Sequence, residues 1–149
     1  MPSGEPFDSD DADGAVGAID YDVLERIGQR LAGTRRFTDV TLRPEYAPDS
    51  VVAEYDVGYF PSRVERAYLR IRWYDTDDFN VHYSEQCRDG SSWECRWDRH
   101  PNEHDAREHF HPPPDAETPG RDAEHPRDWR DVLSEVLETL DERIRAFWV

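Results

Sequence analysis

The feature that most constrains this chain is a series of segments in which apolar and polar residues alternate. Residues 50–59, 64–74, 79–83 and 93–97 place an apolar side chain at every second position, and residues 37–43 form a shorter, weaker segment of the same kind. Such alternation is typical of β-strands that bury one face and expose the other. Because turn-forming residues separate the segments, the pattern predicts an antiparallel meander of four to five strands.

Two segments with helical spacing flank the strands. An apolar stripe within residues 23–31 follows Asp20, a favourable N-cap, and Gly33 is a suitable end for that helix. A longer apolar stripe runs through residues 129–147, with Pro126 near its first turn. We therefore expect an α+β fold in which an N-terminal helix and a long C-terminal helix pack on one face of the sheet.

The beginning of the chain differs in composition from the rest. Residues 1–18 are acidic, glycine-rich and poor in apolar side chains, so we expect a disordered acidic tail followed by a single α+β domain over residues 19–149. No apolar run approaches the roughly 18 residues that span a bilayer, and no signal peptide is visible. We expect a cytoplasmic protein with no membrane partner, in which Cys87 and Cys95 stay reduced and unpaired.

The charge of the chain suggests an adaptation to salt. It carries 34 acidic residues against 18 basic residues, all of them arginine, and its formal charge is -16. Disordered acidic chains are poor in aromatic residues, whereas 12% of this chain is aromatic. At 1 M salt, repulsion between carboxylates is screened beyond about 3 Å. The composition is typical of a halophilic, haloarchaeal-type protein, and it excludes nucleic-acid binding by bulk charge.

The predicted sheet face that turns away from the helices is rich in arginine, histidine and tyrosine. With three-residue loops between the strands, we expect two cross-strand rows and two flanking tyrosines. These are Arg72–His82–Asp98, Arg70–Ser84–Arg96, Tyr68 and Tyr74. Guanidinium groups match phosphate oxygens, a histidine beside a carboxylate suits acid–base chemistry, and tyrosine rings stack on unpaired bases. The alternative interpretation is a solvated face with cross-strand ion pairs.

Residues 100–126 are dense in histidine and proline, and the triple proline at 112–114 predicts a loop. Four histidines crowd its first half: His100, His104, His109 and His111. Histidines in such a loop bind a metal, supply an acid and a base for phosphodiester cleavage, or serve structure alone. Their spacing matches no closed structural metal site, so we predict neither a metal nor a cofactor.

Several of these elements follow one another in a familiar order. They are the adjacent residues His82-Tyr83 in one predicted strand, the strand end Arg96-Trp97-Asp98, the segment containing Pro101 and His104, and the cluster His109-Phe110-His111. This order resembles the TumE-like family, the toxin half of prokaryotic toxin–antitoxin pairs. The resemblance implies a toxin-like protein that is neutralised by a small antitoxin, usually a helix-turn-helix DNA-binding protein, and it makes an RNA target plausible.

Two functional hypotheses follow. The first is a toxin that acts on RNA as a metal-independent ribonuclease, with substrate held by Arg70, Arg72, Arg96, Tyr68 and Tyr74, and with catalytic groups His82, Asp98, His100, His109 and His111. The second is a non-enzymatic protein-interaction module of a halophilic cytoplasm. Whether the chain is an enzyme therefore stays open at this point, as does a homo-oligomeric state.

The composition yields a prediction about stability. We expect the fold to require molar salt, because dilute buffer restores repulsion among the 34 acidic residues. The free energy of unfolding, followed by circular dichroism, should fall steeply below about 1 M KCl. A protein that is equally stable in dilute buffer would remove the halophilic interpretation.

Overall fold

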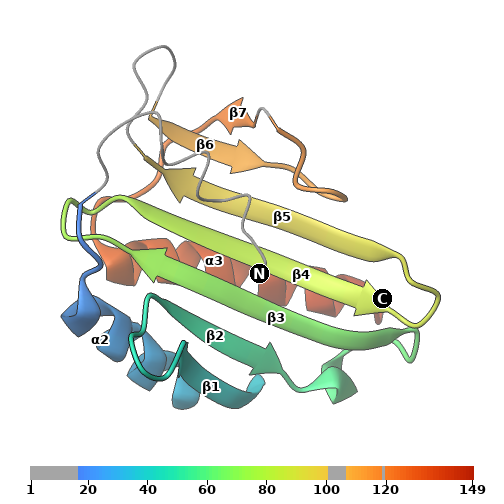
Figure 1. The fold of residues 1–149 in the computed structure, drawn as a ribbon. Helices are drawn as coiled ribbons and strands as arrows, with labels where there is room; N and C mark the ends of the chain where they lie inside the picture. The colour runs from blue at the N-terminus through green and yellow to red at the C-terminus, as the bar shows by residue number, and fades with distance from the viewer. Residues whose placement is uncertain (1–16, 101–106, 119) are drawn as a thin grey trace.

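The computed structural model describes residues 17–100, 107–118 and 120–149. Helix α2 (Tyr21–Ala32) precedes a seven-stranded antiparallel sheet whose strands lie side by side in chain order, and helix α3 (Trp129–Ala146) follows it (Figure 1). The strands are β1 (Phe37–Arg43), β2 (Ser50–Tyr55), β3 (Val64–Trp73), β4 (Phe79–Cys87), β5 (Ser92–Arg99), β6 (Glu108–His111) and β7 (Arg121–Asp122). The described part of the chain is therefore an α+β meander. The tail predicted for residues 1–18 lies mostly outside it.

Both predicted helices are confirmed. The side chain of Asp20 accepts a hydrogen bond from the backbone N–H of Val23 at 3.1 Å, and Gly33 is the C-cap of α2. Asp128 caps α3 in the same way, because its carboxylate accepts a hydrogen bond from the N–H of Arg130 at 2.8 Å. The apolar stripe of each helix is buried.

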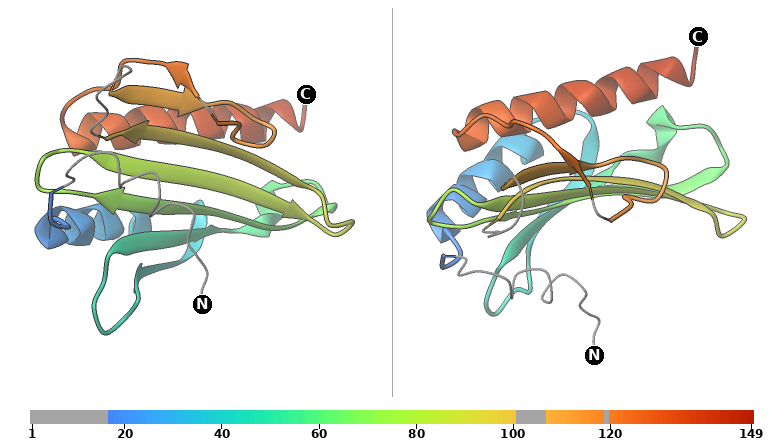
Figure 2. Two further views of the ribbon diagram at one scale, coloured as in Figure 1. Left: turned by 45° about the horizontal axis from the view of Figure 1, so that its top comes forward. Right: turned by 90° about the horizontal axis from the view of Figure 1, so that it is seen from above.

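The two helices lie on the same face of the sheet (Figure 2). The core fills the space between them and the strands, and it includes Trp73 and Phe79, whose rings stack with 5.0 Å between their centroids. Successive residues of a strand point to opposite faces, so the residues between the core positions of β3, β4 and β5 line the other face of the sheet. We call this second surface the open face. Within the described ranges, no helix has an apolar stretch long enough to cross a membrane.

The predicted number of strands is wrong, because the sheet has seven strands rather than four to five. The two additional strands, β6 and β7, lie within residues 100–126, which were predicted to be a loop. Phe110 of β6 packs against Trp97 on the helix side, with 5.4 Å between ring centroids, while His109 and His111 lie on the open face. A four-residue strand with a single apolar side chain carries too weak an alternation to be recognised in the sequence.

The second strand is shorter than the alternation suggests. It ends at Tyr55, and the 3-10 helix η1 (Val57–Tyr59) takes the place of the predicted continuation to residue 59. The carboxylate of Asp56 accepts a hydrogen bond from the N–H of Gly58 at 2.9 Å. This local bond stabilises a turn in place of the extended strand.

The predicted strand register is also wrong, by two residues. The observed cross-strand pairs are Arg70–His82, Arg72–Asn80, Ser84–Glu94, His82–Arg96 and Asn80–Asp98. The N–H of Cys87 bonds to the carbonyl of Ser91 at 2.9 Å, which leaves a loop at 88–90, with Gly90 at φ 89°. The loop has the expected length but begins one residue early. Such a displacement changes each cross-strand partner by two positions and leaves every side chain on its predicted face.

The two cysteines are unpaired, as predicted. Cys87 and Cys95 are both free thiols. Cys95 lies in the core, and burial raises its pKa to about 12. A thiol that stays protonated near neutral pH is a poor nucleophile, which agrees with the absence of Cys95 from the predicted site.

An ion pair joins the last turns of α3 to the C-terminal end of strand β4, the central strand of the sheet. Glu85 on β4 has a side chain that is 2% exposed, and Arg143 donates to its two carboxylate oxygens at 2.6 and 2.7 Å. The hydroxyl of Tyr83 donates to the same carboxylate at 2.5 Å. The Arg143 guanidinium also lies 3.4 Å from the ring centroid of Trp93. The charge on Glu85 is therefore neutralised inside the core.

A second buried charge secures the opposite end of the sheet. The side chain of Arg99, at the end of β5, is 2% exposed. It donates to the carbonyls of Asp77 and Pro126 at 2.7 and 3.0 Å, and its Nη1 lies 3.3 Å from the carboxylate of Glu108. One guanidinium thus connects the β3–β4 turn, strand β6 and the segment that leads into α3.

The buried pair predicts a large effect of a single substitution. Replacing Arg143 by methionine leaves the Glu85 carboxylate without a cation in the core, and we expect this to lower the free energy of unfolding by about 3–5 kcal/mol. Urea denaturation followed by tryptophan fluorescence measures the change. Combining R143M with E85Q should cost less than R143M alone, because the uncompensated charge is then gone.

The matched control for this prediction is R145M on the same helix. Arg145 is exposed, so its replacement should change the free energy of unfolding by no more than about 0.5 kcal/mol. Equal effects of R143M and R145M would show that the buried ion pair does not hold α3 on the sheet.

Candidate functional site

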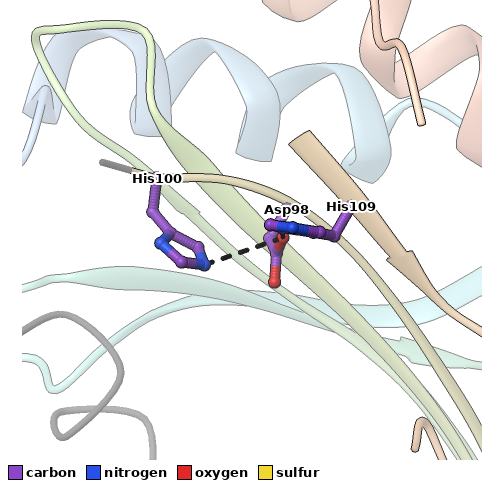
Figure 3. Close-up of side chains that lie close together, drawn as sticks. All are labelled: Asp98, His100 and His109. Carbon is purple, nitrogen blue, oxygen red and sulfur yellow. Dashed lines mark ion pairs between the residues drawn. The ribbon is translucent and has the colours of Figure 1, made fainter. Parts of the chain in front are cut away.

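The histidines of the open face gather at the junction of β5 and β6. Alternation along β5 places Arg96 and Asp98 on this face, and the antiparallel register sets His111 opposite Arg96 and His109 opposite Asp98. His100 directly follows the end of β5. Figure 3 shows the side chains of Asp98, His100 and His109 close together, with a dashed line from His100 to Asp98. Four of the five predicted catalytic residues therefore lie together, and we call these four residues with Arg96 the Asp98 cluster.

Asp98 is the centre of this cluster, and its side chain is only 2% exposed. Its Oδ2 atom lies 3.0 Å from Nε2 of His111 and 3.4 Å from Nε of Arg96. Its Oδ1 atom lies 3.5 Å from Nδ1 of His109 and 4.0 Å from Nε2 of His100. No described residue forms a hydrogen bond with Oδ1. One carboxylate oxygen is thus held in place, and the other faces two imidazole rings.

The surroundings keep this carboxylate ionised. Burial on its own raises the pKa of Asp98, because a charge is poorly solvated away from water. The hydrogen bond from His111 and the charges of His111, Arg96 and His100 act in the opposite direction. Their combined effect is larger and holds the pKa of Asp98 below its usual value.

His111 is fixed on both sides of its ring. Its Nδ1 atom lies 3.0 Å from the carbonyl oxygen of Glu117, and its Nε2 atom faces Asp98. The Nη2 atom of Arg96 approaches the same ring at 3.2 Å. Because both ring nitrogens have partners and the side chain is 6% exposed, His111 is suited to orient Asp98 and Arg96.

His82 lies opposite Arg96 and one row away from Asp98, so the predicted pairing of His82 with Asp98 is wrong. Its Nε2 atom lies 3.1 Å from Oε1 of Glu94, and the hydroxyl of Ser84 donates to the same carboxylate at 3.4 Å. The hydrogen bond from His82 is the largest cause that holds the pKa of Glu94 below its usual value. Glu94 was not among the predicted site residues, although its position two residues before Arg96 places it on the same face.

The three arginines predicted to bind phosphate share the open face, but their side chains have different neighbours. Arg96 contacts Asp98 and His111, as described above. The Arg70 guanidinium lies 5.7 Å from the ring centroid of Tyr68, and Nε of Arg72 lies 3.9 Å from a carboxylate oxygen of Asp49. Only Arg96 belongs to the Asp98 cluster, while Arg70 and Arg72 lie further across the sheet on β3.

The two predicted stacking tyrosines occupy different environments. Tyr68 is 9% exposed, and the guanidinium of Arg66 lies 4.1 Å from its ring centroid. Its ring is therefore covered by arginine rather than open to a base. Tyr74 lies just beyond β3, in an isolated bridge with Ile19. Neither tyrosine is part of the Asp98 cluster.

The Asp98 cluster has two chemical capacities. Its imidazole rings and its guanidinium are the groups that transfer protons and neutralise a phosphate. Among the described residues, Asp98, His100 and His109 also form a group suited to a metal ion, since one ligand atom from each lies within 4.8 Å of the others. Pro101 and His104, which contribute to the family resemblance, lie outside the described residues.

The lowered pKa of Asp98 predicts how stability depends on pH. An ionised group with a depressed folded-state pKa stabilises the fold above its unfolded-state pKa, and this contribution is lost as the pH falls through the folded value. At neutral pH we expect D98N to lower the free energy of unfolding by about 3 kcal/mol, because Arg96 and His111 lose their counter-charge. The difference from the wild type should shrink below about pH 4.

Urea denaturation from about pH 7 to about pH 3 tests this prediction. The matched control is D122N, because the Asp122 side chain is 76% exposed, and its replacement should have little effect at any pH. A cost of D98N that does not change with pH would contradict the assignment of Asp98 as the ionised centre.

Comparison with known proteins agrees with the earlier resemblance. No curated protein and no solved structure matches this chain. A family model described as toxin TumE matches residues 24–144. The match begins inside α2, includes the whole sheet and the Asp98 cluster, and ends in the last turn of α3. Since it covers well over half of the 149 residues, the chain belongs to the TumE toxin family.

Proposed function

We propose that this chain is the toxin of a toxin–antitoxin pair and that it acts on RNA as a ribonuclease through the Asp98 cluster. Membership of a toxin family implies an antitoxin partner. The observation that carries the proposal is a buried, ionised carboxylate with three histidines and an arginine around it. A buried carboxylate with a shifted pKa that lies among other titratable groups is typical of catalytic sites.

The geometry supports cleavage by the 2′-hydroxyl of the RNA itself. In this reaction a base removes the 2′-hydroxyl proton, the oxygen attacks phosphorus, and an acid protonates the 5′-oxygen as the P–O5′ bond breaks, leaving a 2′,3′-cyclic phosphate. The ring centroids of His100 and His109 are 5.8 Å apart, which suits two proton-transfer groups on either side of one phosphate. Arg96 neutralises the phosphate, and no metal takes part in this scheme.

The remaining predicted residues have supporting roles in this proposal. Asp98 orients His109 and His100, and His111 holds Asp98 through its second oxygen. Arg70 and Arg72 bind flanking phosphates along the open face, since they belong to the same rows as the cluster. His82 is held by Glu94, so we assign it to the substrate-binding surface.

Two observations favour a second candidate function. Both ring nitrogens of His111 are engaged within the protein, and Trp148 and Tyr46 are 61% and 89% exposed. A buried polar cluster together with exposed aromatic side chains also suits a non-enzymatic module that binds a protein partner. Such a module would bind its antitoxin and leave RNA intact.

The ribonuclease proposal predicts metal-independent cleavage. Purified protein in concentrated KCl with EDTA should cut an end-labelled single-stranded RNA and leave 2′,3′-cyclic phosphate ends. Loss of a general acid or base typically slows a reaction by about 100-fold or more, so H100Q and H109Q should each reduce the cleavage rate by at least that factor. Circular dichroism verifies that each variant is folded.

The control is R88A, which removes a positive charge from the distant β4–β5 hairpin, where Arg88 donates to the carbonyl of Ser62 at 2.8 Å. Its cleavage rate should equal that of the wild type. RNA that stays intact with folded wild-type protein, although induced expression arrests growth and the antitoxin relieves it, would favour the interaction module. Cleavage unaffected by both histidine substitutions would place the activity elsewhere.

A further inference from the structure

We propose that Asp98, His100 and His109 form a binding site for a divalent transition-metal ion, with Zn²⁺ as the best-fitting species. The proposal goes beyond the ribonuclease activity and differs from the sequence-based prediction that no metal is bound. The starting point is the Oδ1 atom of Asp98, which belongs to a side chain that is 2% exposed and accepts no hydrogen bond from the described residues. A buried carboxylate oxygen left without a hydrogen bond is costly unless a cation completes its surroundings.

The distances around this oxygen fit a metal site. With bonds of about 2.1 Å, the ligand atoms of a tetrahedral zinc site lie about 3.4 Å apart. Nδ1 of His109 is already 3.5 Å from Oδ1 of Asp98, and Nε2 of His100 is 4.0 Å away. A small side-chain rotation of His100 brings the third atom into range, since all three ligand atoms lie within 4.8 Å of one another.

The residues behind the ligands are arranged to support them. His111 bonds to Oδ2 of Asp98 at 3.0 Å, which leaves Oδ1 available to a metal. The second nitrogen of His109, Nε2, faces a carboxylate oxygen of Asp122 at 3.8 Å, an arrangement that orients metal-binding histidines in many proteins. The backbone N–H of His100 donates to the backbone carbonyl of Arg107 at 3.1 Å, which fixes the main chain that carries the third ligand.

The ligand types select the class of metal. Two imidazole nitrogens and one carboxylate oxygen suit Zn²⁺ and its first-row neighbours, whereas Mg²⁺ and Ca²⁺ prefer oxygen ligands alone. Three protein ligands leave the fourth position of a tetrahedral ion open to water or to a phosphate oxygen. In the proposed ribonuclease, metal binding engages the imidazole rings of His100 and His109 that transfer protons and replaces their contacts with Asp98. This consequence rests on the proposed function, and it makes Zn²⁺ an inhibitor.

Metal titration of the full-length protein tests the site without any assay of activity. After treatment with EDTA and dialysis, Zn²⁺ is titrated by calorimetry, and Co²⁺ serves as a spectroscopic probe whose visible absorption reports tetrahedral coordination. We expect one equivalent of either ion to bind, and we expect no comparable binding of Mg²⁺. H100Q, H109Q and D98N should each weaken Zn²⁺ binding by at least about 10–100-fold, since loss of an outer-shell partner alone costs that much.

The matched control is H82Q, which removes a histidine from the same face of the sheet but outside the proposed site, and its Zn²⁺ affinity should equal that of the wild type. H100Q keeps the test decisive if D98N fails to fold, because the His100 side chain is more exposed than its neighbours. Absence of stoichiometric Zn²⁺ binding, or affinity unchanged in both H100Q and H109Q, would overturn the proposal.

Different experimental results would refute the metal-site proposal and the ribonuclease proposal. Zn²⁺ binding with the expected variant pattern, but intact RNA in the presence and absence of EDTA, refutes the ribonuclease and supports the site. RNA cleavage in EDTA without any Zn²⁺ binding refutes the site and supports the ribonuclease. Cleavage that occurs only after Zn²⁺ is added supports the site and refutes the metal-free scheme.

Discussion

A charge that is removed from water must be neutralised within the protein, and this constraint acts on three side chains of β4 and β5. Glu85, Asp98 and Arg99 are each 2% exposed. Glu85 draws Arg143 of α3 onto the sheet, Arg99 connects the β3–β4 turn to the segment before α3, and Asp98 gathers the histidines of β6. Because an uncompensated buried charge costs several kcal/mol, these contacts determine where α3 and β6 lie relative to β4 and β5.

The two faces of β5 show how the same requirement leads to different outcomes. On the helix side, Arg99 is satisfied by carbonyls and a carboxylate at fixed distances, so the arrangement is complete. On the open face, Asp98 is satisfied at Oδ2 only, while Oδ1 faces two rings at 3.5 and 4.0 Å. The contacts of Arg99 on the helix side contribute to stability, and the incomplete coordination of Asp98 is the reason why we propose a ligand site on the open face. The proposed proton-transfer role and the proposed metal role both require the rings of His100 and His109, so a single chain cannot fulfil both at once.

Periodicity predicts the parts of the fold that depend on a repeated pattern. The helices follow from apolar stripes and from the cap at Asp20, and the first five strands follow from alternation. Strand β6 could not be predicted, because it has four residues and only one apolar side chain, Phe110. The register of the central hairpin depends on whether its loop begins at residue 88 or 89, and composition does not distinguish these positions. The faces were nevertheless right, since a shift of two residues preserves them.

The sequence indicates which residues lie near one another in the candidate site, but it does not indicate which of them contact each other. Asp98, His100, His109 and His111 belong together because the chain returns beside β5, yet the partner of Asp98 depends on the register and on a strand that was not recognised. The exposed fraction of each side chain distinguishes the residues that a ligand could reach from those that support them. The side chains of His100, Arg96 and His109 are 18%, 13% and 10% exposed, against 6% for His111 and 2% for Asp98. In the proposed site, a phosphate or a metal ion that arrives from solvent would contact His100, Arg96 and His109 first. Of the two least exposed groups, Asp98 would contribute Oδ1 to the ligand, and His111 would act through its contacts with Asp98 and Arg96.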